Sequence, residues 1–173
     1  MAHRMRGTPT IMNTETALIT GCTSGIGLYL AHEFAKHGHP LVLVAPVDTE
    51  LQQLKAELVA AHQVSVRVFA KDLEREQSAQ EVFNALDAES VTVDILVNNA
   101  GHGFRGNSWE LPIEKDLSIV RLNIEAVLRL TKLFLPGMVK RGRGRLFNTA
   151  SVAGFEPGPM LAVYHASKAF VLS

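Results

Sequence analysis

Between residues 20 and 27 the sequence reads Thr20-Gly-Cys-Thr-Ser-Gly-Ile-Gly27. A short apolar run, residues 16–20, leads into this stretch, and residues 26–37 follow it with apolar side chains at helical spacing. The three glycines are therefore predicted to form the turn from a buried strand into a helix. Such a turn at the first strand is typical of α/β folds that bind a ligand beside the turn.

Each glycine of this turn has a physical reason to be there. Gly21 allows a tight turn, Gly25 lets a ligand approach the backbone, and Gly27 lets the helix pack closely on the strand. The first N–H groups of the helix and its dipole then favour an anion. The spacing, G-x-x-x-G-x-G, differs from the commonest dinucleotide fingerprint. It predicts a pyrophosphate site, with a plain turn as the alternative, and we interpret Cys22 as a small turn residue rather than a redox thiol.

Strand and helix patterns alternate along the rest of the chain. The further predicted strands are short and apolar, at residues 41–45, 65–70, 94–97 and 145–149. The further predicted helices cover residues 49–62, 74–87, 113 to about 140, and 163 onward. The inner face of the last helix is predicted to consist of Val163, Ala166, Phe170 and Val171. Buried strands separated by helices, joined by right-handed crossovers, predict a Rossmann-type doubly wound parallel sheet in a three-layer αβα arrangement.

Length and composition limit the class of protein. The chain has 173 residues, 47% of them hydrophobic, and its 17 Lys and Arg balance its 17 Asp and Glu. We expect a polar, disordered leader at residues 1–14 and one domain at residues 15–173, with no nucleic-acid or membrane partner. A single cysteine fits a reducing, cytoplasmic compartment. His37 and His39 flank a glycine, but no carboxylate or cysteine cluster joins them, so no metal site is predicted.

A second group of small and amide residues follows the predicted strand at residues 94–97. It reads Asn98-Asn-Ala-Gly101. Ligands of doubly wound sheets bind beyond the carboxyl ends of the strands, so this group is expected beside the glycine turn. By itself an ordinary Asn/Gly turn would explain it equally well. His102 and His165 adjoin this group and Tyr164, and either could line the pocket without a role in the reaction.

The third feature is a set of three polar side chains near the end of the sequence. Ser151 follows the predicted strand at 145–149, and Tyr164 and Lys168 are four residues apart on the next helix. Residues four apart share a helix face. A tyrosine has a reference pKa of about 10, and a nearby ammonium favours the phenolate and lowers that value. The set therefore predicts a tyrosine that exchanges a proton at neutral pH.

Taken together, these motifs resemble the short-chain dehydrogenase/reductase family. The resemblance rests on the glycine turn, on Asn98-Asn-Ala-Gly101, on Ser151, and on Tyr164-x-x-x-Lys168, and it runs from about Thr16 to the last residue. It implies an NAD(P)-dependent oxidoreductase that interconverts an alcohol and a carbonyl compound. The family often forms dimers or tetramers, so a homo-oligomer is an accompanying expectation.

The resemblance also implies residue roles. Tyr164 would be the general acid in reduction and the base in oxidation, with Lys168 lowering its pKa and holding the nicotinamide ribose. Ser151 would orient the substrate oxygen, and Asn123 would support a water-linked proton path to Lys168. Asp72 would contact the adenine ring. The implied cofactor-binding set is Gly21, Thr23, Ser24, Gly25, Ile26, Gly27, Asp72, Leu73, Asn99, Ala100, Gly101, Tyr164 and Lys168.

Two departures from the family pattern leave alternatives open. At the end of the second strand stands Ala45-Pro46-Val47-Asp48, with neither an acid for the ribose of NAD nor an arginine for the phosphate of NADP. Many similar members have an Ala-Arg pair here, which favours NADP over NAD. Family members also continue with further strands, whereas this sequence ends five residues after Lys168. The fold is therefore expected to lack the last strands, with an exposed fifth strand. A binding module without turnover, or an inactive fragment, is the alternative to an enzyme.

Overall fold

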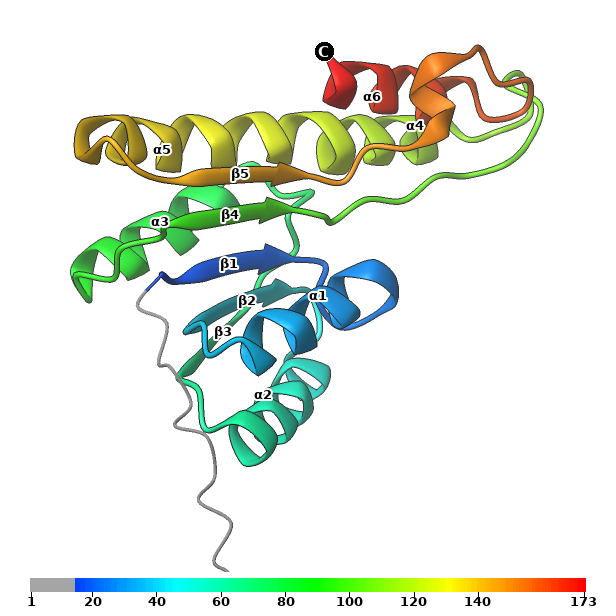
Figure 1. Cartoon of the computed structure of the whole chain (residues 1–173). Helices are drawn as coiled ribbons and strands as arrows, with labels where there is room; N and C mark the ends of the chain where they lie inside the picture. Colours follow the sequence, from blue (N-terminus) through cyan, green and yellow to red (C-terminus); the bar gives the residue numbers. More distant parts are fainter. Residues whose placement is uncertain (1–14) are drawn as a thin grey trace, which may run out of the picture.

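The computed structural model describes residues 15–173, so the predicted leader lies outside the described residues (Figure 1). The strands are β1 Ala17–Thr20, β2 Leu41–Ala45, β3 Val66–Ala70, β4 Ile95–Asn98 and β5 Arg145–Asn148. The α-helices are α1 Gly25–Lys36, α2 Asp48–His62, α3 Ser78–Ala88, α4 Ile113–Val120, α5 Ala126–Arg141 and α6 Ala162–Leu172. Two shorter helices complete the fold, η1 at Arg121–Glu125 and η2 at Val152–Phe155.

The five strands form one parallel sheet in the order β3-β2-β1-β4-β5. The chain therefore moves outward from β1 to β3, crosses back over β1, and continues outward through β4 to β5. The carboxyl ends of β1 and β4, where the order reverses, form the crevice in which such sheets bind ligands. The predicted doubly wound α/β fold is confirmed.

Alternating side chains of the strands build two cores, one on each face of the sheet. Ala17 and Ile19 of β1 pack with the apolar faces of α1 and α2. Leu18 of the same strand packs with α3 and α5 on the other face. Because both faces are covered, β1, β2 and β4 are buried along their whole length. This explains why they read as continuous apolar runs rather than as alternating ones.

The outer strand β5 differs from the central strands. All four of its residues are exposed, and it pairs with β4 on one side while no strand of the described residues lies on its other side. Figure 1 shows β5 at the margin of the sheet, followed by the segment that leads to α6. The predicted exposed edge is therefore found among the described residues.

Two helices differ from their predicted limits. The helix expected at residues 74–87 begins only at Ser78, because residues 72–78 form tight turns in which the Ser78 hydroxyl donates to the Asp72 carbonyl at 2.6 Å. The long stretch from residue 113 is divided by η1, a π-helical segment between α4 and α5. A π-helical insertion rotates the side chains that follow it, and such insertions are frequent at functional sites.

The predicted inner face of α6 is wrong at Ala166 and Phe170, while Val163 and Val171 are partly buried. Ala166 and Phe170 are exposed, whereas Ser167 and Lys168 are buried. The cause is the packing of α6, which contacts η2, α4 and η1 rather than the sheet. The helix therefore turns polar side chains toward the cleft instead of presenting an apolar face to a core.

Candidate active site

The glycine turn follows β1 as predicted, and its geometry requires glycine. Gly21 has a φ of +62°, and a Cβ atom there would stand 2.9 Å from the Cα atom of Ala100. A Cβ atom at Gly27 would overlap the carbonyl oxygen of Gly21 and crowd the amide of Asn99. Gly25 has a φ of +52° and open space above it. The first turn of α1 thus lies directly against the end of β4, and its backbone is accessible to a ligand.

A pocket of about 890 Å³ opens at the carboxyl ends of the strands. It is lined by Gly21, Thr23, Ser24, Gly25, Ile26, Val44, Ala45, Pro46, Lys71, Asp72, Leu73, Glu74, Asn99, Ala100, Gly101, His102, Gly103, Leu122, Thr149, Ala150, Ser151, Leu161, Tyr164 and Lys168. The predicted cofactor-binding residues all belong to this lining except Gly27, which lies beneath the turn. The structure therefore brings the three motifs to one cleft, while their individual roles stay predictions.

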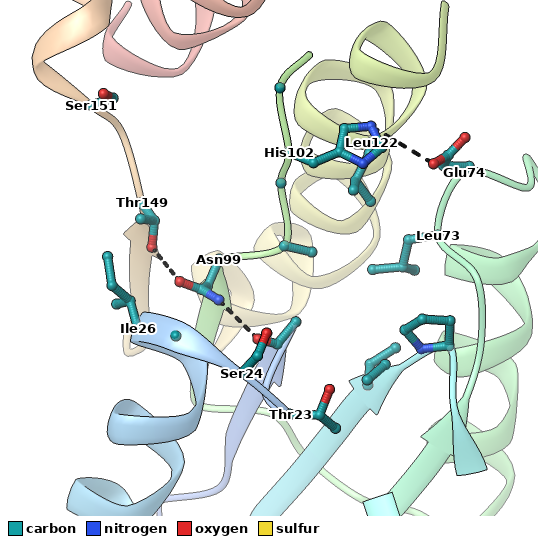
Figure 2. A pocket seen from close by; sticks show the side chains of 18 of the residues that line it. Thr23, Ser24, Ile26, Leu73, Glu74, Asn99, His102, Leu122, Thr149 and Ser151 are labelled. Atoms are coloured by element: carbon teal, nitrogen blue, oxygen red, sulfur yellow. Dashed lines mark hydrogen bonds and ion pairs between the residues drawn. The ribbon is translucent and has the colours of Figure 1, made fainter. Parts of the chain in front are cut away.

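Asn99 connects three strand ends below this pocket. Its side-chain amide donates to the carbonyl oxygens of Thr20 at 3.0 Å and Gly21 at 3.2 Å. Its side-chain oxygen accepts from the Thr149 hydroxyl at 3.1 Å (Figure 2). The Thr20 hydroxyl in turn accepts from the backbone N–H groups of Asn99 and Ala100, each at 3.0 Å. These bonds fix the floor of the pocket and hold the ends of β1, β4 and β5 together.

Ser151, Tyr164 and Lys168 lie at the end of the pocket near β5. The Lys168 side chain is only 6% exposed, and its ammonium donates to the Thr149 carbonyl at 2.8 Å. Its Nζ atom is 5.8 Å from the centre of the Tyr164 ring. Burial lowers the pKa of Lys168 from its ordinary value. The Ser151 hydroxyl accepts from the Ala153 N–H at 3.2 Å and caps η2.

Asn123 does not line the pocket but lies directly behind it. It is 1% exposed, and it comes from the π-helical segment. Its side chain accepts from the His102 N–H at 3.0 Å and donates to the His102 carbonyl at 2.8 Å. It also donates to the Ser167 hydroxyl at 3.0 Å, which donates to the Tyr164 carbonyl at 2.7 Å. Asn123 thus ties the loop after β4 to α6.

A further polar cluster was not predicted from the sequence. The Ser118 hydroxyl lies 2.8 Å from His102 Nε2 and donates to the Glu74 carboxylate at 2.8 Å. Because a carboxylate only accepts, Ser118 must accept from a protonated Nε2 of His102. Figure 2 shows the His102 ring facing Glu74 in the pocket wall. His102 lines the pocket, as its position beside Asn98-Asn-Ala-Gly101 allowed, but Glu74 and Ser118 lie far from it in sequence and form no motif with it, so no local signal indicated the cluster. His165 does not line this pocket and bonds to the Glu156 carbonyl.

The region that distinguishes NAD from NADP has an unusual composition. Ala45 and Pro46 line the pocket and carry no charge. Asp48 is the first residue of α2, accepts from the Gln52 amide at 3.2 Å, and does not belong to the lining. Cys22 is fully buried beneath the turn, and burial raises the pKa of its thiol to about 12. This thiol stays protonated at neutral pH, in agreement with a packing role.

Among residues 15–173, no three His, Cys, Asp or Glu side chains are arranged to hold a metal ion. Within the same residues, no helix has the length and apolar character needed to cross a bilayer.

Comparison with known proteins agrees with this architecture. The family model described as short chain dehydrogenase matches residues 15–173. The human very-long-chain 3-oxoacyl-CoA reductase is 35% identical over 162 residues, which cover 91% of this chain and 51% of the relative. The chain therefore spans about half the length of the curated relatives that it matches.

Solved structures give the same result. A short-chain dehydrogenase from Sphingobium yanoikuyae in complex with NADPH is 38% identical with a TM-score of 0.86, and the match covers 91% of this chain and 61% of that one. The bulky-bulky ketone specific alcohol dehydrogenase from Comamonas testosteroni is 36% identical with a TM-score of 0.87, covering 92% and 64%. On these grounds the chain belongs to the short chain dehydrogenase family.

Proposed function

We propose that this chain binds NADP or NAD in the pocket at the strand ends and interconverts an alcohol and a carbonyl compound. The observation that carries the proposal is the buried ammonium of Lys168 beside Tyr164, at one end of a pocket with a glycine-lined floor. A dinucleotide fits the residues present, because Gly21, Gly25 and Gly101 leave the backbone accessible where a pyrophosphate would bind. The NADPH complex of the similar Sphingobium enzyme supports this assignment.

When bound, the nicotinamide supplies hydride for reduction or accepts it in oxidation. In this proposal the Tyr164 hydroxyl donates its proton to the substrate oxygen in reduction and removes one in oxidation. The ammonium of Lys168 lies 5.8 Å from the centre of the Tyr164 ring, so its positive charge favours a negative oxygen at this site. Lys168 has three N–H donors, and the Thr149 carbonyl takes one of them. Two donors remain for the ribose hydroxyls and for a water near Asn123.

In this proposal Ser151 donates a hydrogen bond to the substrate oxygen that Tyr164 protonates. Its hydroxyl accepts from the Ala153 N–H, which leaves the hydroxyl proton available for a substrate oxygen. A hydrogen bond from Ser151 would polarise the carbonyl and place it against Tyr164. Asn123 is buried and holds the loop after β4, so its role in the proposal is to maintain this alignment.

A second candidate is a chain that binds the dinucleotide without turnover. The observation in its favour is the openness of the substrate side, where Val152 is 81% and Phe155 79% exposed close to Ser151. Described residues provide no cover over these side chains. A substrate would then be poorly shielded from water, and alignment with Tyr164 would be loose.

Nicotinamide fluorescence and NADPH oxidation separate the two candidates. The chain is titrated with NADPH and NADH, and oxidation is then followed with a 3-oxoacyl thioester and with a bulky ketone as substrates. We expect saturable binding and turnover, with Tyr164→Phe lowering kcat/KM by about 10²- to 10⁴-fold while NADPH affinity stays unchanged. Binding without turnover on either substrate supports the second candidate. Failure to bind either dinucleotide shows that both are wrong for this chain.

We include a cytoplasmic location and a homo-oligomer in the proposal. The single cysteine of the sequence supports a reducing compartment. Exposed apolar side chains on α4 and α5, including Leu117, Val120 and Leu128, support a self-associating surface. Sedimentation of the purified chain tests the second point.

A further inference from the structure

We propose that Lys71 recognises the 2′-phosphate of NADP, in place of the arginine that is absent at the end of β2. This inference rests on the proposed function and names the residue that selects the cofactor. Lys71 follows β3 directly, and its backbone N–H donates to the Ala45 carbonyl at 2.9 Å. It lines the pocket together with Ala45 and Pro46. The lysine therefore lies beside the position where the family selects between the two dinucleotides.

The surroundings of Ala45 disfavour the other cofactor. NAD is selected by a carboxylate that binds the ribose 2′-hydroxyl at the end of β2. Here Ala45 and Pro46 provide none, and the nearest acid in sequence, Asp48, bonds to Gln52 outside the pocket lining. Among residues 15–173, the end of β2 itself thus offers no carboxylate to a 2′-hydroxyl, and the acids of the pocket lining, Asp72 and Glu74, follow β3 instead.

The Lys71 side chain is held in a way that lets it move to a phosphate. Its ammonium donates to the Glu81 carboxylate at 2.6 Å, and both side chains are partly exposed. This hydrogen bond and the charge of Lys71 hold the pKa of Glu81 below its ordinary value, so the Glu81 carboxylate is ionised at neutral pH. Solvent-accessible ion pairs contribute little to stability. The flexible four-carbon stem of lysine allows the ammonium to exchange Glu81 for a phosphate dianion.

The other charged side chains that line the pocket form hydrogen bonds with other partners. In the part of the chain that the structure describes, Lys71 and Lys168 are the lysines of the lining, and no arginine belongs to it. Lys168 bonds to Thr149 after β5, at the opposite edge of the sheet from β3. Asp72 accepts from the Glu74 N–H at 2.9 Å, and Glu74 accepts from Ser118 at 2.8 Å. Lys71 is therefore the lysine available to a phosphate at the β2–β3 end.

The N-terminus of α1 lines the same pocket and offers a separate site for an anion. Ser24 precedes α1 and does not cap it through its side chain. Ser24 and Thr23 both line the pocket, so two hydroxyl groups are close to the first turn of the helix. The positive end of the helix dipole favours the pyrophosphate there, which leaves the 2′-phosphate to the charge of Lys71.

Fluorescence titration of the intact chain with NADPH and NADH tests the inference, with competition by adenosine 2′,5′-bisphosphate and by 5′-AMP. Lys71→Gln is expected to weaken the binding of NADPH and of the bisphosphate by about tenfold, while the affinities for NADH and 5′-AMP change less than twofold. Glu81→Gln removes the ion pair that holds Lys71, and it is expected to strengthen NADPH binding about two- to fivefold. Lys132→Gln, an exposed lysine of α5 outside the pocket, is the matched control.

The outcomes distinguish this inference from the proposed function. Opposite effects of Lys71→Gln and Glu81→Gln, confined to the 2′-phosphorylated ligands, support the inference. If both dinucleotides bind but Lys71→Gln weakens neither, or weakens both equally, the inference is wrong and the proposed function stands. If neither dinucleotide binds the parent chain, both are wrong. A thermal unfolding transition shared by all variants shows that the fold is intact.

Discussion

At the scale of the residue, the buried ammonium of Lys168 lowers the stability of the fold at the position where the proposed function needs a positive charge. A charged group loses hydration when it is buried, and one hydrogen bond to Thr149 does not replace all of its water contacts. The lowered pKa of Lys168 has the same cause. The same burial makes its charge more effective at Tyr164, because screening by water is weaker.

We expect Lys168→Met to raise the free energy of unfolding at pH 7 by about 1 kcal/mol and to abolish turnover. The Thr149 carbonyl lines the pocket, so water can replace the lost donor. Because the pKa of Lys168 is lower in the folded state, the stability lost by burying the charged ammonium is largest at pH values below the folded-state pKa. This loss becomes smaller as the pH rises from the folded-state pKa toward the ordinary value of 10.5. Urea unfolding at pH 7 and at alkaline pH should show the difference shrinking. A difference that grows with pH would contradict this account.

At the scale of the element, two helical glycines have opposite consequences. Gly27 in α1 lies under the carbonyl of Gly21 and against the Asn99 amide. Gly137 in α5 faces only the terminal nitrogen of Arg141, at 3.0 Å from a built Cβ atom. A backbone carbonyl cannot move without distorting the turn. The Arg141 guanidinium, which donates to the Val93 carbonyl at 3.0 Å through its other terminal nitrogen, needs to shift by only a few tenths of an ångström. Close packing therefore requires glycine at position 27. At position 137 no packing requires it, and glycine there lowers helix stability because its backbone loses more conformational entropy on folding.

Gly27→Ala is expected to destabilise the chain by at least about 2 kcal/mol, because the methyl group forces the turn away from α1. Gly137→Ala should instead stabilise it by about 0.5–1 kcal/mol. Chemical denaturation monitored by circular dichroism measures both, and each substitution is the control for the other. Equal stability of the two variants would show that the turn and α1 are not in close contact.

For the whole molecule, the main consequence of the fold is its exposed edge. The four residues of β5 are exposed, and Phe147 keeps 47% of its surface accessible. A strand edge with unpaired backbone groups is a template for pairing with another chain. The central strands are protected from this because each has a neighbour on both sides.

We expect the chain to self-associate as its concentration rises, and Phe147→Lys to reduce this association several-fold by placing a charge on the edge. Analytical ultracentrifugation over a range of concentrations measures the effect. Val59→Lys is the control, since Val59 is an exposed apolar residue of α2, which belongs neither to an edge strand nor to the α4 and α5 surface. An equal reduction by both variants would attribute the association to general hydrophobicity instead.

The local amino-acid pattern was sufficient to predict the central strands, the glycine turn and the Tyr164–Lys168 pair. The central strands are buried on both faces, so each reads as an apolar run, and the glycine turn follows from the tight connection between β1 and α1. The Tyr164–Lys168 pair follows from helix periodicity alone. These features depend on residues close in sequence, and they determined the fold class, the location of the cleft and the family resemblance.

Tertiary structure decided the features that depend on strand order and helix packing. Lys71 meets Ala45 because β3 lies beside β2, and Ser118 meets Glu74 across 44 positions of sequence. The inner face of α6 was predicted as apolar, but the helix packs on η1 and η2 and buries Ser167 and Lys168 instead. Periodicity describes one element at a time, whereas these contacts arise only when separate elements pack, and no local pattern specifies which side chains then meet.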